Sequence, residues 1–424
     1  MITLIQGGYV VNPATGICGV NDIFIVDETV KEIAPHIERE AHRVIDAKGK
    51  YVFPGFVDLH EHLREPGFEY KETIASGTMA AAAGGFTTIC PMPNTKPVID
   101  NRVMVEYLNF KAAKDSLIHI IPVGALTLSQ NGGELADISG MAAAGAMALS
   151  EDGKSVMNPL LYKEGMKKAA ELGLVILAHC EDKNLLAGGV LNAGKKAEKL
   201  GFPGITNSVE DVIVARDILL AKETGAKLHL CHCSTADSVA LVRLGKSLGV
   251  KLSAEVCPHH FAMTEDEILG DDANYKMNPP LRTKADVDAL IAGLADGTME
   301  VIATDHAPHS AEEKKRSIKD APFGIVGSET AFALSYTTLV KAGHLTISQL
   351  VEKLSTNPAR ILGIDRVDIS AGHIADLVIA ETEQPYVIDV KKFISKGKNS
   401  PFGGRSVYGK ILLTMVNGEI VFEI

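Results

Sequence analysis

Two histidines separated by one residue, His60 and His62, follow an apolar segment near the start of the chain. Residues two apart on a β-strand point to the same face, so both imidazoles can converge on one metal ion. Imidazole is a common ligand of zinc and of other divalent transition metals. The spacing therefore predicts a metal site where this strand ends.

Further residues of the ligand type follow apolar segments later in the chain. They are Asp152, His179, His232 and Asp305, and Asn94 occupies a similar position. Random placement of 14 histidines would rarely put four of them after strands. Six ligands are more than one tetrahedral ion needs, so the pattern favours two ions that share a bridging carboxylate. Imidazole with carboxylate suits zinc best, although manganese or cobalt could replace it.

Such a pair of ions would support hydrolysis of an amide. Two ions about 3.5–4 Å apart can hold a hydroxide between them and polarise a carbonyl oxygen. Coordination lowers the pKa of water to about 7, which makes the nucleophile available at neutral pH. The amide nitrogen leaves poorly unless it is protonated, so a proton shuttle is also needed. Asp305, after the last strand, is the candidate.

Eight strand-like segments that alternate with helical ones must position these ligands. The predicted strands span 52–59, 86–92, 119–126, 146–150, 174–178, 227–231, 251–257 and 300–303. Amphipathic helices are predicted at 160–172, 209–224, 236–248 and 286–295, and Ser208 with Asp211 resembles a capping box. Eight repeats of this α/β type close most naturally into a (β/α)₈ TIM barrel. An open doubly wound sheet, with its ligands at one switch point, is the competing fold.

The two ends of the chain predict a second, smaller domain. Short alternating segments at 1–5, 22–26 and 30–33 resemble those at 376–380, 410–416 and 419–423, and Asn417-Gly418 is typical of a hairpin turn. We expect the ends to pair into one discontinuous β-sandwich. The predicted domains are 1–50 with 365–424 for the sandwich, and 51–364 for the metal-dependent barrel.

Composition argues against several functions. The net charge of −11 is not offset by any long basic run, so no nucleic-acid or anionic-membrane surface is expected. No apolar stretch approaches the roughly 20 residues that cross a bilayer. The amino terminus lacks a secretory signal, and the six scattered cysteines do not form a disulfide framework. These features predict a cytoplasmic protein.

With these residues in view, the chain resembles the amidohydrolase superfamily and, within it, the bacterial type I dihydroorotases. The resemblance covers essentially the whole length. It rests on Asp-Leu-His-Glu-His-Leu-Arg-Glu-Pro-Gly (58–67), Met-Pro-Asn-Thr (92–95), Glu-Asp-Gly (151–153), Asn-Pro-Pro-Leu-Arg (278–282), Ala-Thr-Asp-His-Ala-Pro-His (303–309) and Ala-Pro-Phe-Gly (321–324). Each motif is weak alone, and together they are specific.

The resemblance implies two zinc ions per subunit. One would be held by His60, His62, Asp152 and Asp305, and the other by Asp152, His179 and His232, with Asp152 as the bridge. Some relatives use a carboxylated lysine as the bridge, and Lys154 is discounted for that role because Asp152 already fits the motif. The implied reaction interconverts N-carbamoyl-L-aspartate and L-dihydroorotate in pyrimidine biosynthesis, by attack of a bridging hydroxide with Asp305 as the catalytic proton shuttle.

The substrates of this family carry a carboxylate, and the sequence offers groups to bind it. Arg64, two residues beyond His62 on the same predicted strand face, can make a bidentate contact. The family pattern implies further substrate contacts from His62, Asn94, Asn278, His309 and the backbone at Phe323 and Gly324. A surface ion pair of Arg64 with Glu65 or Glu69 is the alternative.

Two segments are left without a firm role. His259-His260 fits a family motif, and support behind the metal ligands is the favoured interpretation. The polar segment 310–320 is either a lid over the substrate or an ordinary loop.

Several rival functions remain at this point. Hydantoinases and dihydropyrimidinases share His-x-His but normally bridge their metals with a carboxylated lysine. Allantoinases carry asparagine where this chain has Arg64, so the arginine favours an anionic substrate. A non-catalytic homologue beside aspartate transcarbamoylase is a third possibility, although every ligand is present here. A homodimer, or a complex of two active partners with the transcarbamoylase, is a family expectation only.

Overall fold

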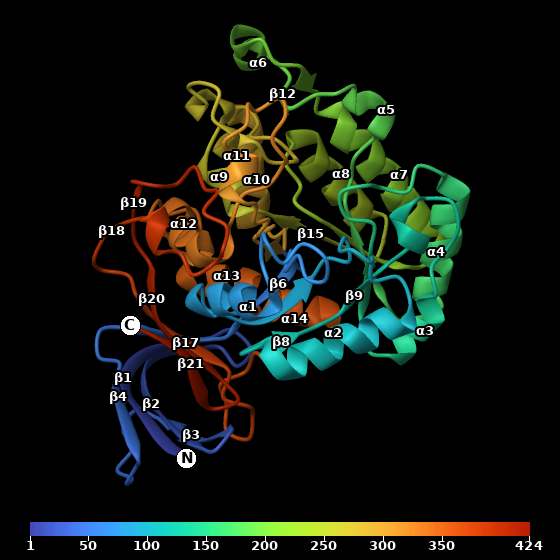
Figure 1. Ribbon diagram of the computed structural model, residues 1–424. Helices are drawn as coiled ribbons and strands as arrows, with labels where there is room; N and C mark the ends of the chain where they lie inside the picture. The colour runs from blue at the N-terminus through green and yellow to red at the C-terminus, as the bar shows by residue number, and fades with distance from the viewer.

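A computed structural model describes residues 1–424 of the chain. The molecule has two parts, a barrel of parallel strands wrapped by helices and a curved sheet to which both termini contribute (Figure 1). The amino and carboxyl ends lie on the same side of the molecule, away from the helices that surround the barrel. No helix is both long and apolar enough to span a bilayer.

The barrel strands run parallel and follow one another in chain order. They are β6 (Phe56–Glu61), β7 (Phe86–Pro91), β8 (His119–Ile120), β9 (Val123–Ala125), β10 (Ala148–Ser150), β11 (Val175–Ala178), β14 (Lys227–Leu230), β15 (Leu252–Val256) and β16 (Val301–Ile302). The short strands β8 and β9 together form the third predicted strand, and Pro122, which has no N–H to donate, lies between them.

A backbone contact closes the ring between its first and last members. Glu61 at the end of β6 forms a parallel bridge with His306, and the His62 N–H donates to the His306 carbonyl at 2.9 Å. Thr304 reinforces this seam, because its hydroxyl and its N–H both donate to the buried carboxylate of Asp58. The sheet is therefore closed, which confirms the predicted barrel over an open doubly wound sheet.

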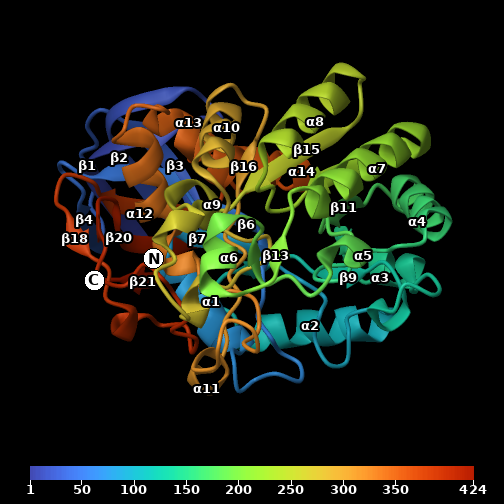
Figure 2. The ribbon, with the colours of Figure 1, turned by 90° about the horizontal axis from the view of Figure 1, so that it is seen from above.

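Helices cover the outside of the barrel (Figure 2). The longer ones are α1 (Ile74–Ala83), α2 (Arg102–Asp115), α4 (Pro159–Leu172), α7 (Ser208–Thr224), α8 (Ala236–Ser247) and α10 (Lys284–Ala295). The shorter ones are α3 (Ile138–Ala143), α5 (Lys183–Leu186), α6 (Lys195–Leu200), α9 (Pro258–Ala262), α11 (Ala311–Lys314), α12 (Ala331–Ser335), α13 (Ile347–Val351) and α14 (Asn357–Leu362). The main apolar core of 56 buried residues includes side chains of both the strands and the surrounding helices.

The capping box expected at α7 is not formed. The helix begins at Ser208 with Asn207 as its N-cap, and no side chain caps it. Asp211 instead accepts hydrogen bonds from the hydroxyls of Thr235 and Ser238 at the start of α8. The predicted capping box is therefore wrong. Asp211 bonds the neighbouring helix α8 instead of the start of its own helix.

The terminal sheet has eight strands from both ends of the chain. They are β1 (Ile2–Asn12), β2 (Ile17–Val26), β3 (Thr29–Ala34), β4 (Arg43–Asp46), β5 (Tyr51–Pro54), β17 (Leu377–Glu381), β20 (Lys410–Val416) and β21 (Glu419–Glu423). A separate core of 13 buried residues lies against it. Asn417 and Gly418, with φ values of 50° and 75°, form the predicted turn between β20 and β21. The expectation of a β-sandwich built from both termini is confirmed.

The first predicted strand, 52–59, is divided in two at Gly55. The first part, β5, pairs with β1 and β17 in the terminal sheet, and the second part, β6, belongs to the barrel. A Cβ atom at position 55 would lie 2.1 Å from the Thr87 hydroxyl, so only glycine fits this close passage. Two short strand pairs, β12 (Leu191–Asn192) with β13 (Gly204–Ile205) and β18 (Tyr386–Val387) with β19 (Ser406–Val407), complete the fold.

Candidate active site

All six predicted metal ligands gather at one end of the barrel. Each lies at the carboxyl end of a strand or within three residues of it: His60 in the last two residues of β6, His62 just after β6, Asp152 after β10, His179 after β11, His232 after β14 and Asp305 after β16. All six side chains are buried. The carboxyl ends of parallel strands are where barrels of this type carry their functional groups.

Asp152 and Asp305 lie among the histidine rings. The Oδ1 atom of Asp152 is 3.3 Å from His60 Nε2 and 3.5 Å from His179 Nδ1, and its Oδ2 is 3.6 Å from His62 Nε2. The Oδ1 atom of Asp305 lies 3.4 Å from His60 Nε2 and 3.2 Å from His62 Nε2. Asp152 thus contacts histidines on both sides of the cluster.

Two ring nitrogens in this cluster lack a hydrogen-bond partner. They are the buried Nε2 atoms of His60 and His179. The other nitrogen of His179, Nδ1, lies 2.9 Å from His232 Nε2. Buried polar atoms without partners are rare because they cost free energy. Imidazole nitrogens that converge with carboxylate oxygens are the donor set of a transition-metal site, so the residues fit a bound cation.

The charges in the cluster strongly perturb its pKa values. Burial raises the pKa of Asp305 and Asp152, but the neighbouring histidines lower both well below the usual value. Burial lowers the pKa of His60, yet these two carboxylates raise it well above normal. Burial, with His179 and His60 beside it, lowers the pKa of His232 to about 3. The carboxylates are therefore ionised and available to a cation at neutral pH.

Two residues beside the predicted ligands fix the orientation of their rings. Asn94 accepts from His62 Nδ1 at 3.1 Å and donates to Asp152 Oδ2 at 2.8 Å, so it joins two of the predicted ligands. Glu255 on β15 lies 3.1 Å from His60 Nδ1 and 2.8 Å from His229 Nε2. These contacts leave the Nε2 atoms of His60 and His62 facing the two aspartates.

A cavity of about 190 Å³ opens above the cluster, and every predicted substrate-binding residue lines it. The lining contains His62, Arg64, Asn94, Asn278, His309, Phe323 and Gly324, together with Asp152, His179, His232 and Asp305. The lining thus has two parts, here called its two sides: the histidines and aspartates form one, and Arg64 with the loop residues forms the other. This arrangement offers a cation site beside a site for an anion.

Arg64 reaches this cavity by a different route from the one predicted. Strand β6 ends at Glu61, and Arg64 has a left-handed backbone conformation with φ of 62°, so it does not share a strand face with His62. Its Nε donates to the Pro308 carbonyl at 3.2 Å, and its Nη2 lies 3.5 Å from His309 Nε2. The alternative ion pairs are not formed, because Glu65 pairs with Lys111 and Glu69 accepts from the Gly67 N–H.

His309 is held in one neutral tautomer. The Lys71 ammonium lies 3.2 Å from His309 Nδ1 and can only donate, so Nδ1 accepts. His309 Nε2 must then carry the proton, which it donates to the Phe323 carbonyl at 2.7 Å. Burial, with Arg64 and Lys71 nearby, lowers the pKa of His309 far below its usual value. Sequence reasoning missed Lys71, which lies in a loop without any recognisable motif.

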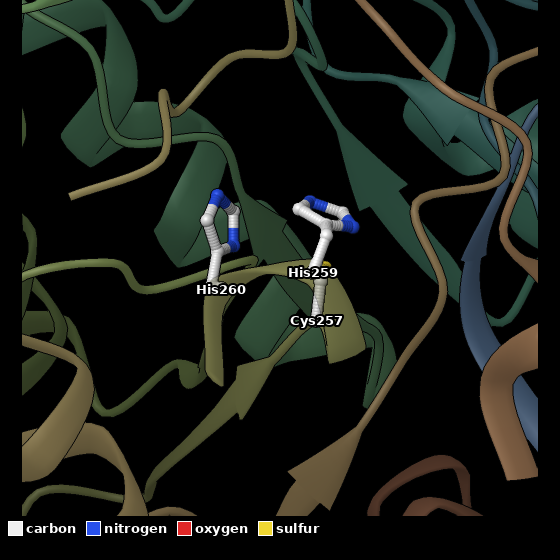
Figure 3. A group of neighbouring side chains, drawn as sticks. All are labelled: Cys257, His259 and His260. Carbon is white, nitrogen blue, oxygen red and sulfur yellow. The ribbon is translucent and has the colours of Figure 1, made fainter. Parts of the chain in front are cut away.

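The histidines left without a role lie together at the end of β15. Figure 3 shows the rings of His259 and His260 on the same side of α9. Cys257 is the residue just before this helix. The ligand atoms of the three residues lie within 4.8 Å of one another. His260 Nε2 donates to the carbonyl of Pro279, the residue after Asn278. His260 therefore contacts the segment that carries a cavity residue, and the expected supporting role stays a prediction.

The segment after His309 is anchored to the rest of the protein. Ser310 caps the short helix α11, and the buried Lys314 donates to the Lys276 and Pro322 carbonyls. Glu313 pairs with Lys71 at 2.9 Å. Lys154, by contrast, is exposed to solvent and does not line the cavity.

Comparison with known proteins agrees with this geometry. A dihydroorotase of Pelotomaculum thermopropionicum is 48% identical over 423 residues, with 100% of this chain and 99% of the relative covered. A dihydroorotase of Staphylococcus epidermidis is 46% identical, with 99% of each chain covered. The chain belongs to the dihydroorotase family. A family model described as dihydro-orotase-like matches residues 49–238 of this dihydroorotase-family chain, a range that contains five of the six predicted ligands.

Solved structures with a similar fold extend the comparison. The L-hydantoinase (dihydropyrimidinase) of Arthrobacter aurescens superposes with a TM-score of 0.89 at 27% identity and covers 100% of this chain and 96% of its own. The dihydropyrimidinase of Brevibacillus agri, at 24% identity and a TM-score of 0.87, shares the fold. This dihydroorotase-family chain therefore has the architecture of cyclic amidohydrolases over its full length.

Proposed function

We propose that the protein interconverts N-carbamoyl-L-aspartate and L-dihydroorotate. The observation that supports the proposal most directly is the cavity itself, which is lined both by a cluster of histidines and aspartates and by Arg64. A cyclic amide with a carboxylate needs both features, one for the reacting amide and one for the charge. Relatives named dihydroorotases, similar over the full length, support this substrate class.

We further propose that two zinc ions occupy the cluster. His60, His62, Asp152 and Asp305 would hold one ion, and Asp152, His179 and His232 the other. The contacts of Asp152 with His60, His62 and His179 support its role as the bridge. Zinc bound there would polarise the amide carbonyl and lower the pKa of water.

The side chains of the cavity would then orient the substrate. Arg64 would form charge-assisted hydrogen bonds with the substrate carboxylate, and Asn94 and His309 would complete this contact. The His309 ring is neutral, and its Nε2 proton, which the Phe323 carbonyl accepts in this structure, would be shared with the substrate. Asn278 and the backbone at Phe323 and Gly324 would contact the remaining polar edges of the ring, and they line the same cavity.

Asp305 would move the proton during the reaction. In the hydrolytic direction a water oxygen bonds to the amide carbon, the ring C–N bond breaks, and the nitrogen gains a proton. Asp305 is ionised, so it would accept the proton of the attacking water and deliver it to the nitrogen. Ring closure uses the same steps in reverse.

Other members of the superfamily are the main alternative. Hydantoinases and dihydropyrimidinases have the same fold, and the cationic wall at Arg64 is the feature that favours an anionic substrate here. The hypothesis that this chain is a non-catalytic homologue beside aspartate transcarbamoylase is disfavoured, because all six ligand-type residues are present and buried. A cytoplasmic location, a homodimer and a complex with aspartate transcarbamoylase stay predictions.

A comparison of substrates tests the proposal. Zinc-loaded protein should open dihydroorotate, measured as loss of ultraviolet absorbance, and should turn over hydantoin, dihydrouracil and allantoin far more slowly. Faster turnover of a neutral ring than of dihydroorotate would refute the substrate assignment. Absence of dihydroorotate turnover, with and without a transcarbamoylase partner, would refute the function.

A further inference from the structure

Glu255 is a carboxylate fully buried inside the barrel, directly behind the histidine and aspartate cluster. It lies on β15 between Ala254 and Val256, and its exposed fraction is 0%. It does not line the cavity, so it has no access to substrate. A charged side chain in such a place costs free energy unless its contacts compensate for the loss of water.

The contacts of Glu255 reach both halves of the ligand cluster. Its Oε1 lies 3.1 Å from His60 Nδ1 and also accepts the backbone N–H of His232 at 3.1 Å. Its Oε2 lies 2.8 Å from His229 Nε2, and the other nitrogen of that ring lies 2.8 Å from the Ser253 hydroxyl. One buried carboxylate therefore contacts a residue assigned to each proposed ion.

The first of these contacts determines which nitrogen of His60 carries a proton. An ionised carboxylate only accepts, so His60 Nδ1 donates to Glu255. The Nε2 atom, which lies 3.3 and 3.4 Å from Asp152 and Asp305, would then be the nitrogen of His60 that binds a cation. A carboxylate behind a histidine in this way also makes the ring a better metal ligand.

The second contact supports an unfavourable backbone conformation. His232 has φ of 34°, in the left-handed region that residues other than glycine rarely adopt. The bond from its N–H to the Glu255 side chain, and the 3.0 Å bond from the Cys233 N–H to the Glu255 carbonyl, restrain this turn. Strained conformations at functional sites persist when surrounding contacts hold them.

We propose that Glu255 is a positioning residue for both proposed metal ions, acting through the ring of His60 and the backbone of His232. The inference rests on the proposed metal site and goes beyond it, because Glu255 was not among the predicted ligands. His229 extends the network by contacting the second carboxylate oxygen, and Ser253 contacts the other nitrogen of the His229 ring. Glu255 thereby makes the positions of two ligands on different strands depend on each other.

Measurement of zinc affinity in Glu255 variants tests this role. We expect Glu255→Ala to lower zinc affinity roughly 10- to 100-fold, measured by competition with a chromophoric chelator. The visible spectrum of the cobalt-substituted protein should also change, because the ligand geometry changes. Once zinc is saturating, the KM for dihydroorotate should stay near the wild-type value, since the Arg64 side of the cavity is untouched, whereas kcat should fall.

The variant Glu255→Gln separates charge from shape. The amide can keep its oxygen toward His60 and His232 while its NH₂ group donates to His229, provided that His229 shifts its proton to the nitrogen facing Ser253. We expect partial rescue, with an affinity between those of the alanine variant and the wild type. Asp217→Asn is the matched control, because Asp217 is equally buried but bonds Arg216 on α7.

The outcomes separate this inference from the proposed function. Wild-type zinc affinity and cobalt spectrum in a folded Glu255→Ala protein would overturn the positioning role. If that variant does not fold, unchanged affinity in Glu255→Gln would overturn it instead. A wild-type protein that binds no zinc or does not open dihydroorotate would refute the proposed function, and not merely the role of Glu255.

Discussion

The two sides of the cavity are built from different parts of the fold. The histidine and aspartate side consists of residues at or just beyond the ends of five barrel strands. The other side is formed by Arg64, His309, Phe323 and Gly324, which all lie in loops. The strand ends carry ionised carboxylates, and the loops carry the positive charge of Arg64. Under the proposed function, the barrel would supply the reacting groups and the loops would select the substrate.

Removal of the proposed proton shuttle should have the largest effect. Asp305→Asn keeps the size of the side chain but cannot accept a proton, so kcat for dihydroorotate should fall about 100- to 10,000-fold. Initial rates from ultraviolet absorbance measure this change at saturating zinc. Activity within a few-fold of wild type in a zinc-loaded Asp305→Asn protein would mean that another group moves the proton.

Changes on the Arg64 side should affect substrate without affecting metal. Arg64→Ala removes a charge-assisted contact worth about 1.5–3 kcal/mol, so kcat/KM should fall roughly 10- to 100-fold. Arg64→Lys should recover part of this loss, because it restores the charge without the bidentate geometry. Elemental analysis should find the wild-type zinc content in both variants. Loss of zinc would show that the two sides are not independent.

A smaller effect is expected from the residue that holds His309. Lys71→Met removes the donor to His309 Nδ1, so the ring is free to change its tautomer. A hydrogen bond of this kind is worth about 0.5–1.5 kcal/mol, which corresponds to a rise in KM of roughly 2- to 10-fold. Lys154→Met is the control, because Lys154 is exposed near Asp152 in sequence but outside the cavity lining. Equal KM values for the two variants would argue against the role of Lys71.

The last effect concerns the stability of the segment after His309 rather than the rate of turnover. Burial lowers the pKa of Lys314 to about 7 from the usual value of 10.5. Between these values the unfolded chain binds a proton that the folded protein does not, so this residue makes stability rise with pH, by at most about 1.4 kcal/mol per pH unit. In Lys314→Met this contribution should disappear. Thermal unfolding midpoints at pH 7, 8 and 9 measure it, and equal pH slopes in both proteins would contradict the pKa assignment.

The sequence was sufficient to predict the barrel and the clustering of histidines and aspartates at one end of it. His60, Asp152, His179 and Asp305 could be found because each lies where a buried apolar segment ends, and such ends meet at one edge of a parallel sheet. The paired terminal strands were recognisable from alternation and from the Asn417-Gly418 turn. The strands and the turn depend on local periodicity, which can be recognised in a single sequence.

Features that depend on contacts between residues far apart in the sequence could not be predicted in this way. Glu255 stands inside an apolar strand, and its partners His60 and His229 come from other strands. The one sequence signal for Glu255 is a charged residue within an otherwise apolar strand, and the sequence reasoning did not use it. Arg64 was placed correctly in the cavity for an incorrect reason, because the left-handed turn that directs it leaves no pattern in the sequence. Lys71 meets His309 only after the barrel has closed.

Titration of zinc-depleted protein with zinc, with dihydroorotate turnover as the readout, tests the central claim most directly. If one side of the cavity holds two ions that share Asp152, turnover should rise until two zinc ions are bound per chain and then stay constant. Arg64→Ala should follow the same titration curve at lower activity. Full turnover without zinc, or a maximum at one zinc ion per chain, would contradict the account.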